Sequence, residues 1–398
     1  MKEYVRMNKM KITPELLQYC REVRRHLHRN PEISFEEEKT SEYILEELNK
    51  LGLQGKRLAG TGVYTVIEAD QPGPVIAVRA DIDALPVQEK NDVSYASTVP
   101  GVAHVCGHDG HVAVLMGLAA MLKKYNNDVL GKVILIFQPA EELLPGGAVS
   151  VIGSGLLEGV DSILGMHLTT LLPTGTISLR SGSLMASINE FCVKVIGRGG
   201  HGSRPHDCID PIIVGTQLVN AWQSIISRGV NPLEAAVLTV GSFNAGTAAN
   251  IIPETAVLKG TVRTLSEKVR ERIKNNFLKL TEEICKAYGA SADISYENGY
   301  PVLINDERIT NIIGDAAISN SIKLFNMPRP VMGSEDFAYY GHVCPAAYFF
   351  LGAGNVEKGY VHPNHSPYFN FDEESLPVGV QVILTTLERL WAEERKNA

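Results

Sequence analysis

The sequence predicts an α/β protein with two domains, and three observations indicate this fold class. The chain has 398 residues, which is more than one hydrophobic core ordinarily organises. Apolar runs at residues 75–78 and 132–137 are typical of buried strands in a central, mostly parallel sheet. Between residues 184 and 298 the expected order becomes strand, helix, strand, strand, helix, strand, which is the order of an inserted ferredoxin-like α+β domain.

Composition excludes several classes of protein. A net charge of -8 and the absence of a basic stripe argue against a nucleic-acid partner. Six cysteines are scattered without the spacing of a disulfide framework, so we expect free thiols in a reducing compartment. No apolar run is long enough to cross a membrane, and residues 1–11 are basic without the apolar core of a signal peptide. We therefore expect a cytoplasmic protein without a membrane partner.

The N-terminal segment predicts two helices. Thr13 and Pro14 suit the N-cap and the first turn of the first helix. Ser34 and Glu37 have the spacing of a capping box for the second helix, which Gly52 would end. Strands are then expected at residues 63–68 and 75–78, before the densest group of reactive side chains in the chain.

That group lies in residues 104–111, which hold one thiol, three imidazoles and one carboxylate. Gly107 and Gly110 allow the backbone to turn tightly. Cys106 and His108 are two residues apart, so in an extended segment their side chains point to the same side. Helical periodicity begins directly afterwards. Thiolate and imidazole together suit zinc and neighbouring transition metals, although a buried cysteine beside surface histidines is the alternative.

Ligand-type residues gather at the carboxyl ends of the expected strands, where open α/β sheets bind ligands. The residues are Asp81 and Asp83, Cys106 and His108, Glu141 and Glu142, and His167. Core packing gives no reason for such residues at four corresponding positions. The sequence therefore predicts a metal site at this edge of the sheet.

The inserted domain divides the first domain in two. Its expected strands and helices are residues 188–196, 210–227, 236–240, 256–263, 266–288 and 292–296. The sequences Gly182-Ser183 and Asn298-Gly299-Tyr300-Pro301 are typical of hinges. We thus expect a first domain formed by residues 1–183 and 299–398, with the insertion at residues 184–298.

Nine short blocks together resemble the M20 family of metallopeptidases and amidohydrolases. The blocks are Arg79-Ala80-Asp81-Ile82-Asp83-Ala84-Leu85-Pro86, Cys106-Gly107-His108-Asp109, Gln138-Pro139-Ala140-Glu141-Glu142, Gly165-Met166-His167, Gly199-Gly200-His201, Asn250-Ile251-Ile252-Pro253, Gly260-Thr261-Val262-Arg263-Thr264, Gly333-Ser334-Glu335-Asp336-Phe337 and His365-Ser366-Pro367. Their order is that of the family, and the subgroup that they resemble hydrolyses N-acyl amino acids. Its members include hippurate hydrolases, auxin-conjugate hydrolases and aminoacylase-like enzymes.

The resemblance implies a catalytic domain with two divalent metal ions, which could be Zn, Mn, Co or Ni. It implies that Cys106 bridges the ions, that His108 and His167 complete one site, and that Glu142 and His365 complete the other. The resemblance further implies that Glu141 is the general base, which takes a proton from water and passes it to the leaving amine. Asp83 then resembles the carboxylate that orients a ligand imidazole. Asp81 stands where other branches have a histidine ligand, and Cys106-Gly107-His108 would supply the replacement.

The resemblance also implies that the insertion is a lid and dimerisation domain. His201 would reach the active site of a partner subunit and stabilise the oxyanion of the tetrahedral intermediate. Asn250 and Arg263 resemble residues that hold the substrate carboxylate. We therefore expect a homodimer acting on a small N-acyl amino acid.

Three hypotheses follow for the activity. The first is a metal-dependent amidohydrolase that cleaves N-acyl-L-amino acids to a carboxylate and a free amino acid. The second is a metal-independent hydrolase with Cys106 as nucleophile, which needs a base aimed at the thiol and does not explain Glu141, Glu142, His167 and His365. The third is a catalytically silent binding protein on the same fold, which would be expected to have lost Glu141 or a ligand. We favour the first, because every one of these residues is present.

Overall fold

The computed structural model describes residues 12–397, so the basic segment 1–11 lies outside the described residues. The chain forms two compact units. The first contains the chain up to Gly182, Ile304–Arg329 and the chain from Asp336 onward, and the second contains Ser183–Leu303 and Pro330–Glu335. The second unit thus begins one residue before the expected insertion, ends five residues after it, and includes a further short segment of the C-terminal half.

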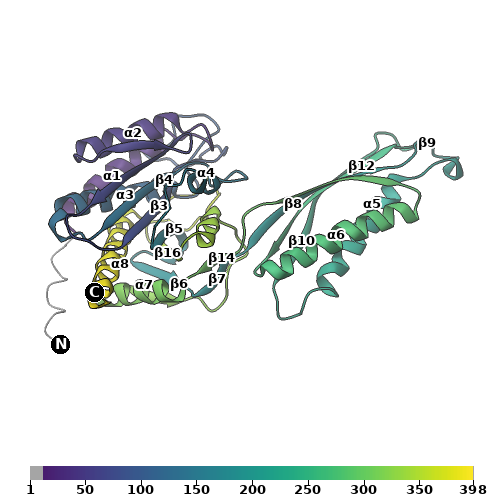
Figure 1. Cartoon of the computed structure of the whole chain (residues 1–398). Helices are drawn as coiled ribbons and strands as arrows, with labels where there is room; N and C mark the ends of the chain where they lie inside the picture. Colours follow the sequence, from purple (N-terminus) through teal and green to yellow (C-terminus); the bar gives the residue numbers. More distant parts are fainter. Residues whose placement is uncertain (1–11, 398) are drawn as a thin grey trace. The chain divides into compact units, whose positions relative to one another are not determined.

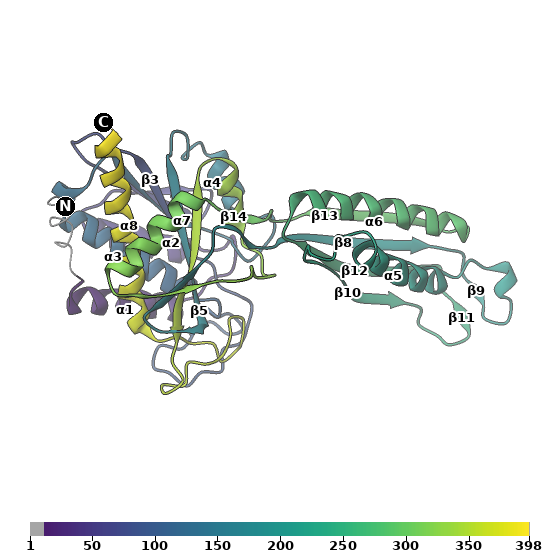
Figure 2. The ribbon, with the colours of Figure 1, turned by 90° about the horizontal axis from the view of Figure 1, so that it is seen from below.

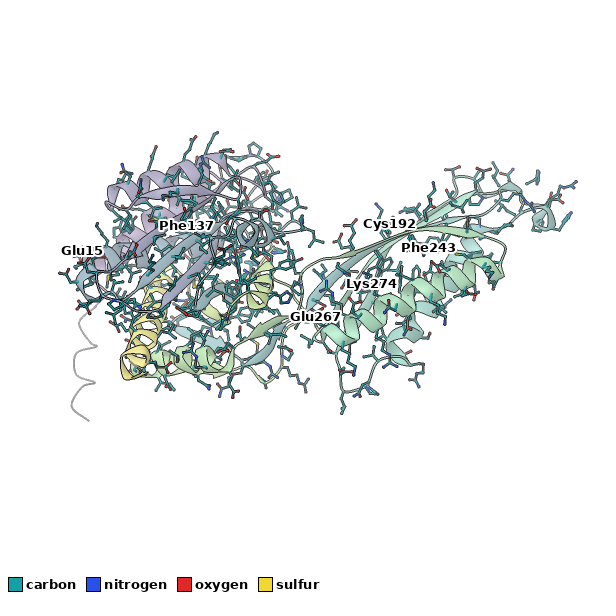
Figure 3. All side chains as sticks on the ribbon, viewed as in Figure 1. Glu15, Phe137, Cys192, Phe243, Glu267 and Lys274 are labelled. Atoms are coloured by element: carbon teal, nitrogen blue, oxygen red, sulfur yellow. The ribbon has the colours of Figure 1, made fainter. Side chains whose placement is uncertain are left out.

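A mixed sheet of eight strands organises the first unit (Figure 1). In spatial order the strands are β1 (Gly55–Leu58), β2 (Gly62–Glu68), β4 (Lys132–Gln138), β3 (Val75–Asp81), β5 (Ser162–Pro173), β16 (Ala346–Gly354), β6 (Thr176–Leu179) and β15 (Lys323–Asn326). The four central strands, β4, β3, β5 and β16, are mutually parallel, whereas β1 and β2 pair antiparallel at one edge. The predicted mostly parallel sheet is confirmed. Figure 3 labels Phe137, whose fully buried side chain belongs to β4.

The helices of the first unit complete its core. They are α1 (Pro14–Arg29), α2 (Glu38–Lys50), α3 (His108–Lys124), α4 (Gly147–Gly153), α7 (Glu307–Ser319) and α8 (Leu376–Asn397), with 3-10 turns η2 (Asn126–Asp128), η4 (Asp336–His342) and η5 (Glu373–Ser375). Helix α3 packs between α1 and α8, and almost all of its residues are buried. Gly117 permits close approach, because a Cβ there would lie 2.6 Å from Cys20 Sγ of α1. The segment of residues 104–111, at which the sequence predicts metal ligands, therefore leads into a buried helix.

The second unit has the predicted ferredoxin-like order (Figure 2). Its elements are β8 (Ser187–Ile196), α5 (Pro211–Ser227), β10 (Ala236–Ala245), β12 (Thr255–Thr264), α6 (Glu267–Ala287) and β13 (Ser291–Asn298). The sheet is antiparallel, with strand order β10-β12-β8-β13. Phe191, Trp222 and Phe277 form an aromatic core between the sheet and the helices. The remaining pairs of short strands are β9 (Gly200–His201) with β11 (Ile251–Ile252), and β7 (Gly182–Met185) with β14 (Leu303–Asn305).

The capping box expected at Ser34 and Glu37 does not form. The start of α2 is instead capped by Glu32, whose Oε2 accepts the Thr40 amide at 2.8 Å. The Ser34 hydroxyl donates to Asp83, and the Glu37 carboxylate binds a loop more than a hundred residues away in the chain. The spacing was therefore misleading, because these two side chains have long-range partners.

Within residues 12–397, no helix is long and apolar enough to cross a bilayer.

Candidate metal centre

The central strands and α3 bring the predicted ligands to one end of the sheet. Asp81 is the last residue of β3, the Glu141–Glu142 pair follows β4, and His108 is the first residue of α3. His167 lies within β5 rather than at its end, because β5 continues to Pro173 beside β16. Gly107, at φ 95°, adopts the left-handed conformation that turns the chain into α3.

Two groups of three side chains share the Cys106 thiol. In the first group, Cys106, His108 and His167 place ligand atoms within 4.8 Å of one another. In the second group, Cys106, Glu142 and His365 do the same. His365 comes from the C-terminal half, and its amide donates to the Val105 carbonyl at 2.7 Å, next to Cys106. The arrangement offers two adjacent tri-dentate sites with Cys106 Sγ common to both.

The imidazoles of His108, which is buried, and of His167, which is half-buried, present the same ring nitrogen to these sites. His167 Nδ1 lies 2.7 Å from the Leu168 carbonyl, to which it donates, and this leaves His167 Nε2 at 3.4 Å from Cys106 Sγ. His108 Nδ1 donates to Asp83, to its carbonyl at 3.0 Å and to its Oδ1 at 3.2 Å. His108 Nε2 is buried without a hydrogen-bond partner. Both rings therefore use Nδ1 for a backbone carbonyl and turn Nε2 toward the other side chains of the group, as metal-bound histidines do.

Asp83 connects three parts of this centre. Its Oδ2 accepts the Ser34 hydroxyl at 2.7 Å and the Glu142 amide at 3.0 Å, while Oδ1 faces His108. The buried Asp83 carboxylate thus orients the His108 imidazole, which belongs to the first group, and the backbone of Glu142, which belongs to the second group. Ser34 has no sequence signal for this role, since its spacing suggested a helix cap.

The charges of the centre fit divalent cations. Burial, followed by the nearby Glu142 and Glu141, raises the pKa of the Cys106 thiol well above its ordinary value. Glu142 Oε1 is buried without a hydrogen bond, 3.1 Å from His365 Nε2 and 3.9 Å from His108 Nε2. A thiol and carboxylates so close together become stable anions only beside a positive charge. The donor set of sulfur, nitrogen and oxygen atoms suits zinc and its transition-metal neighbours.

In a third cluster, of Asp81, His108 and His111, the side chains of Asp81 and His111 are hydrogen-bonded to each other and to neighbouring groups. His111 Nδ1 is hydrogen-bonded to Asp81 Oδ1, and its Nε2 accepts the Leu168 amide at 2.9 Å. Arg79 donates to the other oxygen of Asp81 at 2.8 Å. Asp81 and His111 therefore brace the neighbouring ligands and have no free ligand atom of their own. His111 could have been anticipated, because three residues after His108 on a helix it lies on the same face.

Comparison with known proteins agrees with this geometry. Residues 77–389 match the family described as peptidase family M20/M25/M40. The chain belongs to family M20. It is 42% identical over 369 residues to an N-acetyl-L-cysteine deacetylase of Bacillus subtilis, covering 92% of this chain and 87% of the relative. It is 44% identical over 283 residues to an N-acyl-L-amino acid amidohydrolase of Geobacillus stearothermophilus, covering 71% of this chain and 76% of the relative.

A solved structure of an M20 protein is also similar to this chain. The crystal structure of the Bacillus subtilis YXEP protein, described as a dinuclear metal binding peptidase from the M20 family, superposes with a TM-score of 0.83. It is 33% identical, and the match covers 96% of this chain and 99% of that one. This M20 protein is thus an amidohydrolase of a metal-binding family, and the two groups around Cys106 are candidate metal-binding groups.

The other predicted residues of the M20 chain lie in the second unit. His201 in β9 pairs with Ile251 in β11, and the Asn250 carbonyl accepts the Gly202 amide at 2.8 Å, so His201 and Asn250 are neighbours. Arg263 in β12 pairs with Ile188, near the beginning of β8. Thr255, at the opposite end of β12, lies roughly 25 Å from Arg263 along the strand. Asn250 lies beyond Thr255, so one chain does not bring Asn250 and Arg263 to the same carboxylate.

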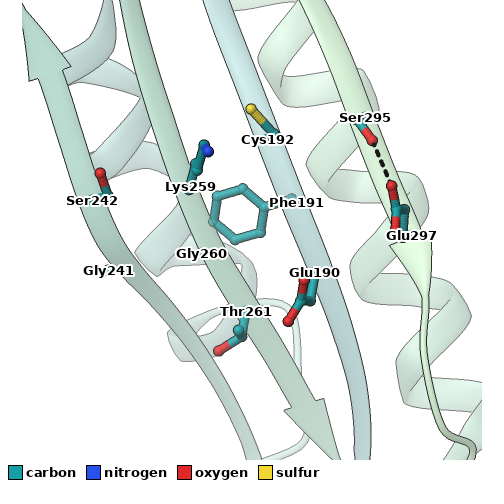
Figure 4. A pocket seen from close by; sticks show the side chains of 10 residues that line it. All are labelled: Glu190, Phe191, Cys192, Gly241, Ser242, Lys259, Gly260, Thr261, Ser295 and Glu297. Atoms are coloured by element: carbon teal, nitrogen blue, oxygen red, sulfur yellow. Dashed lines mark hydrogen bonds between the residues drawn. The ribbon is translucent and has the colours of Figure 1, made fainter. Parts of the chain in front are cut away.

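The second unit also has a shallow hollow of about 370 Å³ in its sheet (Figure 4). Charged residues around it include Glu190, Lys259 and Glu297. Neither a predicted ligand nor a predicted substrate-binding residue lines this hollow, so it does not enter the reaction considered below.

Proposed function

We propose that the protein hydrolyses the amide bond of N-acyl-L-amino acids, releasing a carboxylate and a free amino acid. The observation that carries this proposal is the pair of ligand groups that share Cys106, with Glu141 beside them. The relatives named as an N-acetyl-L-cysteine deacetylase and an N-acyl-L-amino acid amidohydrolase support this substrate class. Two divalent ions, of Zn, Mn, Co or Ni, would occupy the two groups and activate water for attack on the amide carbonyl.

Glu141 and Glu142 would then have different tasks. Both carboxylates belong to candidate groups, but only Glu142 is grouped with the shared thiol of Cys106, together with His365, and it would therefore take the ligand position. Glu141 is buried beside it and can hold the proton taken from water. The same carboxyl group would deliver this proton to the nitrogen of the leaving amino acid. Two adjacent residues would thus divide the tasks: Glu142 would bind metal, and Glu141 would act as the base.

His201 is suited to donate a hydrogen bond through Nε2. The Ser203 amide donates to His201 Nδ1 at 3.1 Å, and the Ser203 hydroxyl oxygen lies 2.9 Å from the same nitrogen. Since an amide can only donate, a neutral His201 must carry its proton on Nε2. An exposed Nε2–H is the group that an oxyanion requires. This supports His201 as the oxyanion donor and gives Ser203 the task of fixing its tautomer.

A substrate carboxylate held jointly by Asn250 and Arg263 would need two chains, because these residues lie near opposite ends of one sheet. We propose a homodimer in which His201 and Asn250 of one chain serve the metal ligands of the other, and in which Asn250 and Arg263 at one substrate carboxylate come from different chains. Each active site would then contain residues of both subunits.

The edge strand β10 is the better candidate for the dimer contact. Val237 and Phe243 on β10 are 43% and 37% exposed, and Ile213 on the neighbouring α5 is 49% exposed (Figure 3 labels Phe243). The opposite edge, β13, exposes only polar or charged residues, namely Ser291, Asp293, Ser295, Glu297 and Asn298. An unpaired edge with apolar neighbours favours pairing with a second copy, whereas charges disfavour it.

A hydrolysis screen tests the activity. Protein freed of metal by chelation would be supplied with Zn, Mn, Co or Ni and offered N-acetyl, N-benzoyl and indole-acetyl amino acids. We expect release of the free amino acid only after metal is restored. Activity that survives complete chelation would favour Cys106 as a nucleophile and overturn the proposal.

The six cysteines are all free, which supports a cytoplasmic location as part of this proposal.

A further inference from the structure

The loop at residues 138–148 carries the two carboxylates of the centre and contains a disfavoured backbone conformation. It begins at Gln138, the last residue of β4, and ends in the first turn of α4. Ala140, directly before Glu141, has φ 53°. This left-handed conformation is disfavoured for a residue with a Cβ and persists only where the surroundings impose it. Ala140 is fully buried, so its peptide groups require protein partners.

Both peptide groups of Ala140 have such partners. Its amide donates to Glu37 Oε1 at 2.8 Å, and its carbonyl accepts the Gly147 amide at 3.0 Å. The second oxygen of Glu37 accepts the Thr61 hydroxyl. Glu37 is itself fully buried and comes from the segment before α2. Burying a carboxylate costs free energy. The Glu37 carboxylate does not offset this cost by capping α2, although it lies directly before that helix.

A second buried group holds the two ends of the same loop. Asp336 Oδ2 accepts the Gln138 side-chain amide at 2.7 Å and the Ala148 backbone amide at 3.0 Å. Arg79 pairs with Asp336 Oδ1 at 2.6 Å and also donates to Gln138 Oε1 at 2.8 Å. The ends are therefore fixed without Glu37, and Glu37 fixes the middle of the loop, at the residue next to the proposed base.

We propose that Glu37 is a positioning residue for the reaction: it holds Ala140 in the left-handed conformation and thereby aims the Glu141 carboxylate. This inference rests on the proposed function, because it takes Glu141 as the base. Without the bond from Glu37, Ala140 relaxes toward an ordinary conformation and rotates the peptide that carries Glu141. The ligand groups keep Cys106, His108, His167 and His365, which lie outside the loop.

The test compares Glu37→Ala with Thr61→Val, a matched control that removes the other hydrogen bond of the same carboxylate. Kinetics use the N-acyl amino acid that the wild-type protein cleaves, at saturating metal, and thermal unfolding is followed in parallel. A misplaced catalytic group costs about 10²-fold, so Glu37→Ala should lower kcat by that factor with little change in KM. Thr61→Val should lose thermal stability but keep kcat.

Two further variants separate positioning from general destabilisation. Glu37→Gln retains an acceptor for the Ala140 amide and should keep most of the activity. Adding Ala140→Gly to Glu37→Ala should recover part of kcat, because glycine adopts positive φ without a Cβ penalty. If Glu37→Ala does not fold, Glu37→Asp takes its place, since it keeps the charge but ends one methylene short and should also lower kcat.

Equal loss of kcat in Thr61→Val and Glu37→Ala, or unchanged kcat in Glu37→Ala, would overturn the inference. Glu141→Gln is measured alongside. If Glu141→Gln remains active, the base assignment fails. If Glu141→Gln is inactive and Glu37→Ala is fully active, only the role of Glu37 fails.

Discussion

Replacing Asp83 by asparagine should weaken metal binding more than its small change in shape suggests. Asp83 Oδ1 faces the His108 Nδ1 donor, and Oδ2 faces the Ser34 hydroxyl and the Glu142 amide. An asparagine side chain has one oxygen and one NH2 group, so either orientation places a donor against a donor. Asp83→Asn therefore removes the charge and at least one hydrogen bond together.

The size of the effect follows from the bonds that remain. A hydrogen bond to a charged group contributes about 1.5–3 kcal/mol, and about 1.4 kcal/mol corresponds to a tenfold change in affinity. His108 keeps the Asp83 carbonyl at 3.0 Å as a second acceptor, so its ring is not released entirely. We expect a loss of roughly 10- to 100-fold in metal affinity, nearer the lower value, as for other residues that orient metal ligands.

The assay is competition for metal against a chromophoric chelator, with Ser34→Ala as the control. Ser34→Ala removes one donor to Asp83 Oδ2 but leaves the Glu142 and His108 contacts in place. It should therefore change affinity much less than Asp83→Asn. An Asp83→Asn protein that binds metal as tightly as the wild type would refute the orienting role of Asp83.

Three further outcomes are expected. Glu141→Gln should retain metal but lose about 10²- to 10⁴-fold in turnover, measured at saturating metal; a loss below tenfold would contradict its assignment as base. Cys106 should react with a thiol reagent slowly in metal-loaded protein and faster after chelation, as mapped by mass spectrometry; equal rates would mean that it is not a ligand. Mixing inactive Glu141→Gln and His201→Ala proteins should restore up to roughly a quarter of wild-type activity, since half of the dimers are mixed and each holds one intact site. No recovery despite subunit exchange would place His201 within its own chain or outside the reaction.

The fold was predictable where local pattern and long-range packing agree. The buried strands β3 and β4 and the order of the inserted domain follow from hydrophobic runs and alternation, which packing reinforces. The short strands β1, β6 and β15 cannot be predicted in this way, because four residues carry too little periodicity to identify a strand. The sequence also does not indicate that β5 extends beyond His167, because this extension depends on pairing with β16, far along the chain.

The candidate site divides in the same way. The ligand residues have chemically distinctive side chains in short motifs, so the sequence indicates them directly. The spacing of Ser34 and Glu37 predicts a helix cap, because capping involves residues three apart, whereas their partners in the structure lie 49 and 103 positions away. Likewise Asp81 gave no sign that Arg79 and His111 would occupy both of its oxygens. Such partners are fixed only when the complete sheet has formed.

The place of β16 in the sheet has a consequence during synthesis. This strand lies between β5 and β6, yet it follows β6 by more than 160 residues, with the whole inserted domain between them. At about 5–20 residues per second, a ribosome needs roughly ten to thirty seconds to produce that length. Throughout this interval β5 has an unpaired edge beside the unfinished metal centre, and exposed edges promote aggregation. We therefore expect chaperones to bind the nascent chain during this interval. The inserted domain can fold before β16 is synthesised and the sheet of the first unit is completed.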